Sequence, residues 1–164
     1  MSRPKHVLIT AKMLFFLLSN YLFGVQAFAY ESTASPWLNV GFYSAHFQSN
    51  LGLRNANPGL GFEYPIAGDW RVTAGRFTNS DDAVSNYVGA YYQPWRWKRW
   101  KLGAVTGLFD GYPRAFDGGW FPALLPVATW ESAQFGVNVV FVPPIKNRLY
   151  GAISFQLKYR VGAP

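Results

Sequence analysis

The clearest pattern in the sequence is an alternation of two kinds of residue near its C-terminal end. One face of the pattern consists of Leu149, Gly151, Ile153, Phe155, Leu157, Tyr159 and Val161. The other face consists of Tyr150, Ala152, Ser154, Gln156, Lys158 and Arg160. Side chains that repeat every second residue share one face of a β-strand, whereas a helix would scatter them. The run is long enough for a membrane strand, which needs about 9–11 residues tilted across lipid.

Seven further segments alternate in the same way or form short apolar runs. They are 37–47, 60–66, 70–78, 84–93, 100–108, 121–130 and 135–141. Short connections, at 67–69, 94–99 and 131–133, take turns with connections that are mostly longer, at 48–57, 79–83, 109–119 and 143–148. An even number of strands with short turns at one end and long loops at the other is typical of bacterial outer-membrane proteins. We therefore expect an all-β fold, an eight-stranded antiparallel transmembrane β-barrel.

The beginning of the chain has the plan of an export signal. Arg3, Lys5 and Lys12 precede an apolar run at 13–25, and the small residues Ala27 and Ala29 offer cleavage sites. A transmembrane anchor is the alternative, but the run is short for the roughly 20 residues that a spanning helix needs. We predict a signal peptide over residues 1–29 and an outer-membrane barrel over 30–164.

Composition supports an exported membrane protein. Aromatic residues make up 19% and charged residues only 14% of the chain, whereas soluble domains carry about 25% charged residues. The net charge of +7 suits nucleic acid, an anionic membrane or an anionic glycolipid. A Trp-Arg-Trp-Lys-Arg-Trp-Lys run at 95–101 has the cations and rings of a nucleic-acid site. After an export signal, it more strongly indicates an anchor at the headgroup level of a membrane, so no nucleic-acid partner is expected.

Candidate chemistry is sparse. There is no cysteine, and His46 is the only histidine after the predicted leader. His46 and Ser80 fall at the same end of the predicted barrel, and serine with histidine is the minimum for acyl transfer. Either residue alone is more often structural. Glu63 has inward parity, and it is either paired with Arg71 or Arg76 or catalytic. The sequence shows neither metal-ligand spacing nor a cofactor motif, so we expect no metal and no cofactor.

Several stretches, in order, resemble the PagP family of outer-membrane lipid A palmitoyltransferases. They are Ser-Ala-His-Phe at 44–47, Arg-Asn-Ala-Asn-Pro-Gly-Leu-Gly-Phe at 54–62, Phe-Thr-Asn-Ser at 77–80, Phe-Pro-Ala-Leu-Leu-Pro-Val-Ala at 121–128 and Phe-Val-Pro at 141–143. The resemblance covers roughly residues 40–161. The chain departs from the family in two places. Asn79 stands where the family has an aspartate, and residues 30–36 are too short for the family's amphipathic helix before the barrel.

The resemblance implies a monomeric enzyme in the outer membrane of a Gram-negative bacterium. It would move an acyl chain from a phospholipid to a hydroxyl of lipid A (lipopolysaccharide). His46 would be the general base, Ser80 the nucleophile or a hydrogen-bond partner, and Asn79 a donor to the developing oxyanion. The barrel interior would hold the acyl chain, and side chains at its bottom would gauge the chain's length.

The resemblance also implies how the lipids would be bound. Breaks in strand pairing at Pro58 and Pro143 would admit lipid sideways, because proline cannot donate to a β-ladder. The loop cations Arg54, Arg114, Lys146 and Arg148 would contact lipid A phosphates, although ordinary solvated loops at an anionic surface explain them equally well.

Two other functions are compatible with the same fold. His-Phe-Gln-Ser-Asn at 46–50 is similar to the His-x-Ser-Asn motif of PagL-type lipid A deacylases, with one extra residue between the histidine and the serine. In a deacylase, Ser49 rather than Ser80 would be essential. A non-catalytic structural or surface barrel is the remaining alternative, because a fold does not fix its function. A pore is not expected, since eight strands leave an interior that side chains fill.

Overall fold

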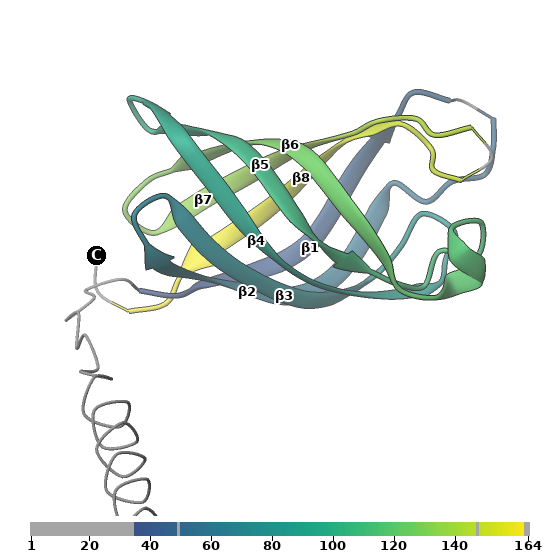
Figure 1. Ribbon diagram of the computed structural model, residues 1–164, viewed down its shortest axis with the longest axis horizontal. Helices are drawn as coiled ribbons and strands as arrows, with labels where there is room; N and C mark the ends of the chain where they lie inside the picture. Colours follow the sequence, from purple (N-terminus) through teal and green to yellow (C-terminus); the bar gives the residue numbers. More distant parts are fainter. Residues whose placement is uncertain (1–34, 49, 147, 163–164) are drawn as a thin grey trace, which may run out of the picture. The chain divides into compact units, whose positions relative to one another are not determined.

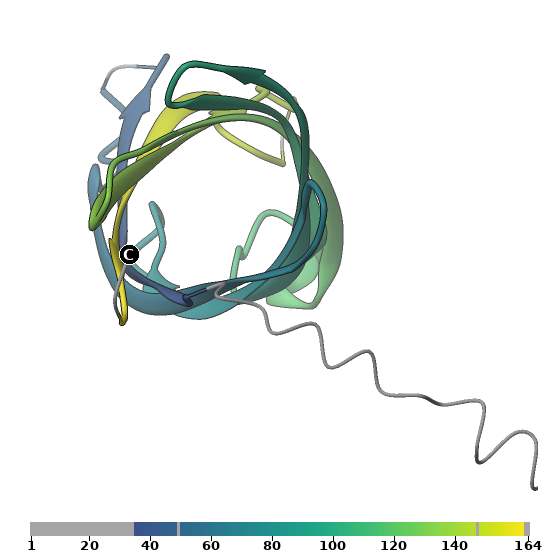
Figure 2. The same ribbon diagram turned by 90° about the vertical axis from the view of Figure 1, so that its left-hand side faces the viewer.

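The computed structural model describes residues 35–48, 50–146 and 148–162. They form a closed antiparallel barrel in which each strand pairs with its two neighbours and β1 pairs with β8 (Figures 1 and 2). The strands are β1 (Trp37–His46), β2 (Ala56–Ala67), β3 (Trp70–Thr78), β4 (Val84–Trp97), β5 (Trp100–Phe109), β6 (Phe121–Glu131), β7 (Phe135–Val142) and β8 (Ala152–Arg160). The predicted eight-stranded antiparallel barrel is thus confirmed. The predicted signal peptide at 1–29 and Ser49 lie outside the described residues.

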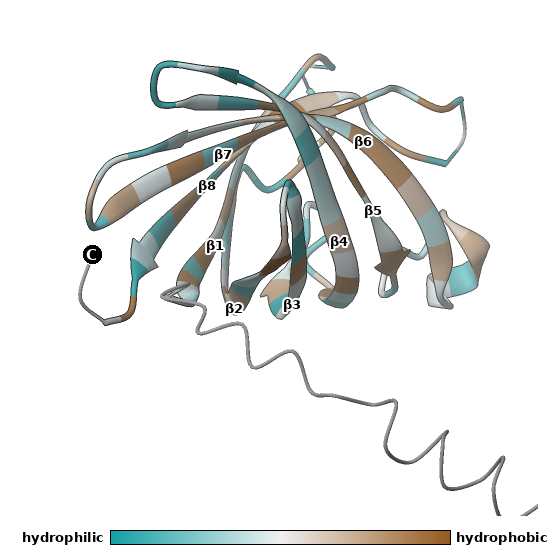
Figure 3. Cartoon of the chain, turned by 60° about the vertical axis from the view of Figure 1, so that its left-hand side comes forward, coloured by the Kyte–Doolittle hydropathy of each residue, from teal (hydrophilic) through white to brown (hydrophobic). Residues whose placement is uncertain are grey.

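The alternation in the sequence corresponds to the two faces of the barrel wall. In β8 the apolar residues Ile153, Phe155, Leu157 and Tyr159 are exposed, and the intervening Ala152, Ser154, Gln156 and Lys158 are buried in the interior. The barrel is therefore apolar outside and, along this strand, polar inside, the reverse of a soluble barrel. The hydropathy colouring in Figure 3 shows hydrophobic positions alternating with hydrophilic ones along the strands.

Three strand boundaries differ from the prediction by more than one residue. β2 begins at Ala56, because Asn57 and Pro58 pair with β1 instead of forming a turn. β4 continues to Trp97, so the predicted turn at 94–99 contains only residues 98–99. β8 begins only at Ala152, because the preceding residues form a separate small turn that is closed by a bridge between Ile145 and Leu149. In each case a long-range or local pairing overrides the residue preference that suggested the boundary.

The connections divide the barrel into two ends. We call the end with the connections 47–55, 79–83, 110–120 and 143–151 the loop end, and the end with 68–69, 98–99 and 132–134 the turn end. All four long loops lie together at the right of Figure 1. The loop at 110–120 contains η1 (Phe116–Gly118), a single 3-10 turn. Among the described residues, no helix is long and apolar enough to cross a membrane.

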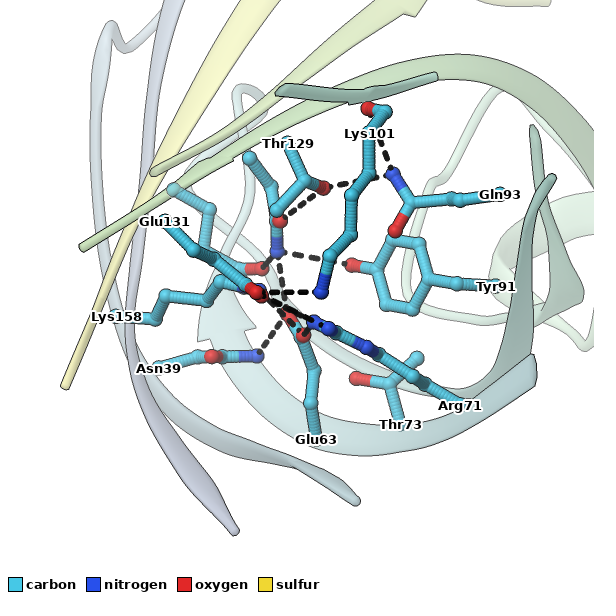
Figure 4. Close-up of polar contacts among 12 residues, drawn as sticks. Asn39, Glu63, Arg71, Thr73, Tyr91, Gln93, Lys101, Thr129, Glu131 and Lys158 are labelled. Atoms are coloured by element: carbon cyan, nitrogen blue, oxygen red, sulfur yellow. Dashed lines mark hydrogen bonds and ion pairs between the residues drawn. The ribbon is translucent and has the colours of Figure 1, made fainter. Parts of the chain in front are cut away.

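The interior is divided in the same way. Toward the turn end, buried charged and amide side chains fill the lumen (Figure 4). Toward the loop end, the interior holds a mainly apolar cavity lined by residues of all eight strands. A small buried hydrophobic cluster lies at the boundary between these two regions and consists of Tyr91, Val105, Val127 and Val140.

Candidate functional site

The candidate catalytic residues meet at the loop end. His46 is the last residue of β1, and Ser80 lies in the loop that joins β3 to β4. The Nε2 atom of His46 lies 2.9 Å from the Ser80 hydroxyl, and the Nδ1 atom lies 2.9 Å from the side-chain oxygen of Asn55. An amide oxygen only accepts hydrogen bonds, so the hydrogen of the neutral imidazole resides on Nδ1. Nε2 is then free to accept the hydrogen of the Ser80 hydroxyl.

The chain Asn55–His46–Ser80 has the layout of a catalytic triad. In such triads a base is oriented by a third group and accepts the proton of a nucleophilic hydroxyl. Asn55 lies in the Arg-Asn-Ala-Asn-Pro stretch at 54–58, but the sequence alone assigns it no role. Its signal was weak, because asparagine in a loop before a proline is also a common turn residue.

Contacts between two loops hold Ser80 in place. The backbone N–H of Arg54 donates to the Ser80 carbonyl at 3.0 Å. The Arg54 side chain donates to the Ala56 carbonyl at 2.6 Å and forms an ion pair with Asp82. Residues 54 and 55 therefore contact both partners of the hydrogen-bonded His46–Ser80 pair.

Asn79 is wholly buried and its side chain is occupied by its own loop. The amide nitrogen donates to the Ser85 hydroxyl and to the Gly111 carbonyl, at 2.9 and 2.8 Å. The amide oxygen accepts from the backbone N–H groups of Asp81 and Ala83, at 2.9 and 3.1 Å. Both amide hydrogens are used, so in this structure Asn79 orders the loop that carries Ser80 and has no hydrogen left for an oxyanion.

An apolar cavity opens beside Ser80. It encloses about 840 Å³ between atoms, including the space at its open mouth, and Ser80 is part of its lining. The other lining residues are largely apolar, among them Phe42, Val105, Ala123 and Leu125. Tyr112, in the loop that follows β5, also lines it. Burial and the charge of Asp81 raise the pKa of this phenol, which keeps the wall uncharged. An unbranched hydrocarbon chain fits such a lining, because apolar groups gain free energy on leaving water.

The seam between β6 and β7 is the shortest in the barrel. Only residues 127–131 of β6 pair with β7, so the described part of β6 from Phe121 to Pro126 has no partner on that side. Ala123 and Leu125 on one side of this seam and Val140 and Val142 on the other line the cavity.

The two prolines predicted to open the wall lie at different kinds of position. Pro143 directly follows the end of β7, next to the seam just described. Pro58 lies within β2 opposite Gly41, where the β1–β2 register shifts. It interrupts the regularity of the β1–β2 pairing but not the strand itself.

The four predicted lipid-binding cations all belong to the loop end and are exposed. Arg114 lies over the ring of Tyr150 at 4.9 Å, and Arg148 lies over the ring of Phe116 at 5.2 Å. These two contacts join the 110–120 loop to the 143–151 loop. Arg54 is paired with Asp82. Lys146, at the tip of the last loop, makes no ion pair with a described residue.

The polar half of the lumen lies between the cavity and the turn end of the barrel. Glu63 is 1% exposed and accepts a hydrogen bond from Lys158 at 2.7 Å, and Arg71 lies 3.6 Å away. Glu63 thus faces inward, as its parity predicted, and of the two alternatives the structure shows pairing, with Lys158 and Arg71 rather than with Arg76. Glu131 interacts with Arg71, Lys101 and Lys158 (Figure 4). Glu131 was not predicted as a lumen residue, although its inward parity with Val127 and Thr129 was a usable signal.

Among the described residues, no group of three or more histidine, cysteine or acidic side chains could hold a metal ion. In comparisons with known proteins, no family model and no curated protein matches the chain.

Proposed function

We propose that this protein spans an outer membrane and transfers an acyl chain from a phospholipid to a hydroxyl of lipid A, as the resemblance to the PagP family implies. One observation carries the proposal: the hydrogen-bonded chain Asn55–His46–Ser80 lies at an apolar cavity. The first part supplies an activated hydroxyl, and the second supplies a place for the hydrocarbon tail of an acyl donor.

The reaction follows from the direction of the hydrogen bonds. His46 Nε2 takes the proton of Ser80 as the Ser80 oxygen attacks the ester carbonyl of the donor. The ester C–O bond then breaks, and the lysophospholipid leaves with the proton from His46. In the second half, His46 takes the proton of a lipid A hydroxyl, whose oxygen attacks the acyl-Ser80 ester. The Ser80 oxygen leaves and regains its proton. In the alternative course, His46 deprotonates the acceptor hydroxyl directly and Ser80 only orients the imidazole.

The membrane location is supported by the outer surface. Large apolar side chains are exposed on every strand, among them Val40, Leu60, Val72, Val88, Leu108, Leu124, Phe141 and Leu157. Surfaces of this extent are unusual for soluble monomers. A closed barrel also leaves no unpaired sheet edge in lipid. The β6–β7 seam would let an acyl chain enter the cavity sideways, with Pro143 at its loop end.

The first experiment is mass spectrometry of lipid A from cells that express the wild-type protein, the His46→Ala variant or the Ser80→Ala variant. Ser132→Ala, at the turn end, is the matched control. All four barrels are brought to equal amounts in the outer membrane. A mass gain of one acyl chain in the wild type and the control, lost in both site variants, is expected.

The other outcomes separate the alternatives. A mass loss would replace the transferase with a deacylase and direct attention to Ser49. No change with a well-folded barrel would overturn both enzymatic functions and leave a non-catalytic barrel. Detection of an acyl-Ser80 ester would establish Ser80 as the nucleophile. Transfer that persists in Ser80→Ala would leave only the alternative course, in which His46 deprotonates the acceptor hydroxyl directly.

A further inference from the structure

The hairpin between β4 and β5 carries a cationic and aromatic surface that the proposed reaction does not use. β4 is 14 residues long and pairs with β5 up to Trp97 and Trp100, with Lys98 and Arg99 as the turn. The hairpin belongs to the turn end and lies at the upper left of Figure 1, opposite the end that carries His46 and Ser80.

A β-bulge sets the direction of the hairpin's tryptophans. Tyr92 pairs with Ala104 and Trp95 pairs with Leu102, so three residue steps of β4 oppose two of β5. The extra residue falls beside Pro94, which has no N–H to contribute to the ladder. Because of this extra residue, Trp95 and Trp97 have the same outward orientation as Tyr92 and Leu102. Regular pairing would have turned both indoles to the lumen.

The result is two highly exposed indole rings. Trp95 is 67% and Trp97 is 63% exposed, more than the other described tryptophans. On the neighbouring strand, the ring of Trp70 stacks on that of Tyr92 at 4.6 Å. Aromatic rings that combine an apolar body with a polar N–H or O–H favour the headgroup level of a bilayer.

Two of the four cations in this hairpin remain available for a partner. Arg96 is held by Asp69 at 2.6 Å, and Lys101 is held by Glu131 at 2.6 Å. Lys98 and Arg99, both exposed, make no ion pair with any described residue. The Lys98 ammonium lies 5.2 Å from the centre of the Trp97 ring. In Figure 3 the hydrophilic colour gathers at the tip of this hairpin.

We propose that Lys98, Arg99, Trp95 and Trp97 form a binding site for anionic phospholipid headgroups, in the leaflet opposite the one that the loop end faces. The two cations bind the phosphate and the excess negative charge, and the indoles lie between the glycerol region and the acyl chains. A zwitterionic headgroup would bring its own cation to the two uncompensated ones, so the charge favours an anionic lipid. This site rests on the proposed membrane location but not on the proposed reaction.

The experiment uses the intrinsic fluorescence of the barrel in phosphatidylcholine vesicles. A minor fraction of the lipid is brominated, either phosphatidylglycerol or phosphatidylcholine with the same acyl chains, and bromine quenches nearby indoles. Six of the seven tryptophans belong to strands at positions near the turn end, and only Trp120 lies in a loop-end connection. Quenching therefore reports chiefly on lipid at the turn end. We expect phosphatidylglycerol to be enriched roughly fivefold per cation at this end of the wild-type barrel.

The variant Lys98→Gln/Arg99→Gln tests the assignment, and Arg76→Gln/Lys146→Gln, which removes two exposed cations toward the loop end, is the matched control. Enrichment that is lost in the first variant and kept in the control supports the site. Equal quenching by the two lipids in the wild type, or enrichment that survives Lys98→Gln/Arg99→Gln, overturns it. Circular dichroism and the shifted gel migration of folded barrels confirm folding. A barrel that does not enter vesicles would overturn the membrane location itself, whereas loss of acyl transfer alone would leave this site unaffected.

Discussion

His46 and Ser80 lie 34 residues apart in the sequence, and their side chains are joined by a hydrogen bond of 2.9 Å. The pairing depends on barrel topology, because the end of β1 and the loop after β3 lie at the same end of the barrel and the 47–55 loop bridges them. A serine hydroxyl becomes a useful nucleophile only when a base is fixed at this distance.

Asn55 is expected to act as a positioning residue for His46. In Asn55→Leu the imidazole loses the partner of Nδ1–H, so both its tautomer and its orientation become free. We expect kcat for acyl transfer to fall about 10- to 100-fold, no more than the lower end of the roughly 100- to 10,000-fold that general acid–base catalysis contributes, because the imidazole itself is still present. KM should change little, since Asn55 does not line the cavity.

The conservative variant Asn55→Asp separates this role from simple loop support. A carboxylate also accepts a hydrogen bond from Nδ1, so Asn55→Asp should retain most of the activity that Asn55→Leu loses. Equal loss in both variants, with unchanged KM, would contradict the positioning role.

Asn79 gives a prediction that opposes the family pattern. Asn79→Asp would restore the family's aspartate, but it would place a carboxylate oxygen against the Gly111 carbonyl in a buried site. Two acceptors cannot share a hydrogen bond, and a buried group left unpaired costs about 1–3 kcal/mol. We expect Asn79→Asp to lower the free energy of unfolding by about that amount and to reduce activity by displacing Ser80. Increased activity in Asn79→Asp would instead indicate a direct catalytic role for this position.

The sequence was sufficient to predict the strands but only part of the site. Period-two alternation identifies which residues share a face, so the eight strands, the inward parity of Glu63 and the common end of His46 and Ser80 could be predicted. Asn55 could not, because its role depends on how a nine-residue loop folds back over β1. The bulge at Pro94 is a similar case: a proline signals a break, but the extra residue that turns Trp95 outward is defined only by the partner strand.

The depth of the cavity should determine which acyl chains are transferred. Ala123 lines the cavity wall, so Ala123→Phe would fill part of its length and shift transfer toward shorter chains. The measurement is the distribution of transferred acyl masses from a mixture of phospholipid donors. The neighbouring Leu124 is exposed on the outer face, so Leu124→Phe is the matched control and should keep the wild-type distribution. The same distribution in both variants would show that the acyl chain lies elsewhere.

The last prediction concerns the charges that fill the other half of the lumen. Glu63 and Glu131 are surrounded by Arg71, Lys101 and Lys158, so the cluster already has one more cation than carboxylates. Glu63→Gln would leave three cations, of which Arg71 and Lys158 are buried, with a single carboxylate. Breaking a buried pair by removing one partner costs about 3–5 kcal/mol, because the other charge stays buried. We expect a decrease of this size in the free energy of unfolding, measured by urea titration of the barrel in vesicles.

Two comparisons make this prediction specific. Asp69→Asn breaks the pair with Arg96, whose side chain is 56% exposed, and should cost no more than about 1 kcal/mol. The double variant Glu63→Gln/Lys158→Gln removes one charge of each sign, so the cluster keeps its original excess of a single cation. It should recover part of the stability that Glu63→Gln loses, and the size of that recovery measures the coupling between the two side chains. The opposite outcome is a double variant whose stability is lower than that of Glu63→Gln by the full cost of Lys158→Gln alone. That result would show that the two charges act independently. Glu63 would then stabilise the barrel through its contacts with Asn138 and Asn39 instead.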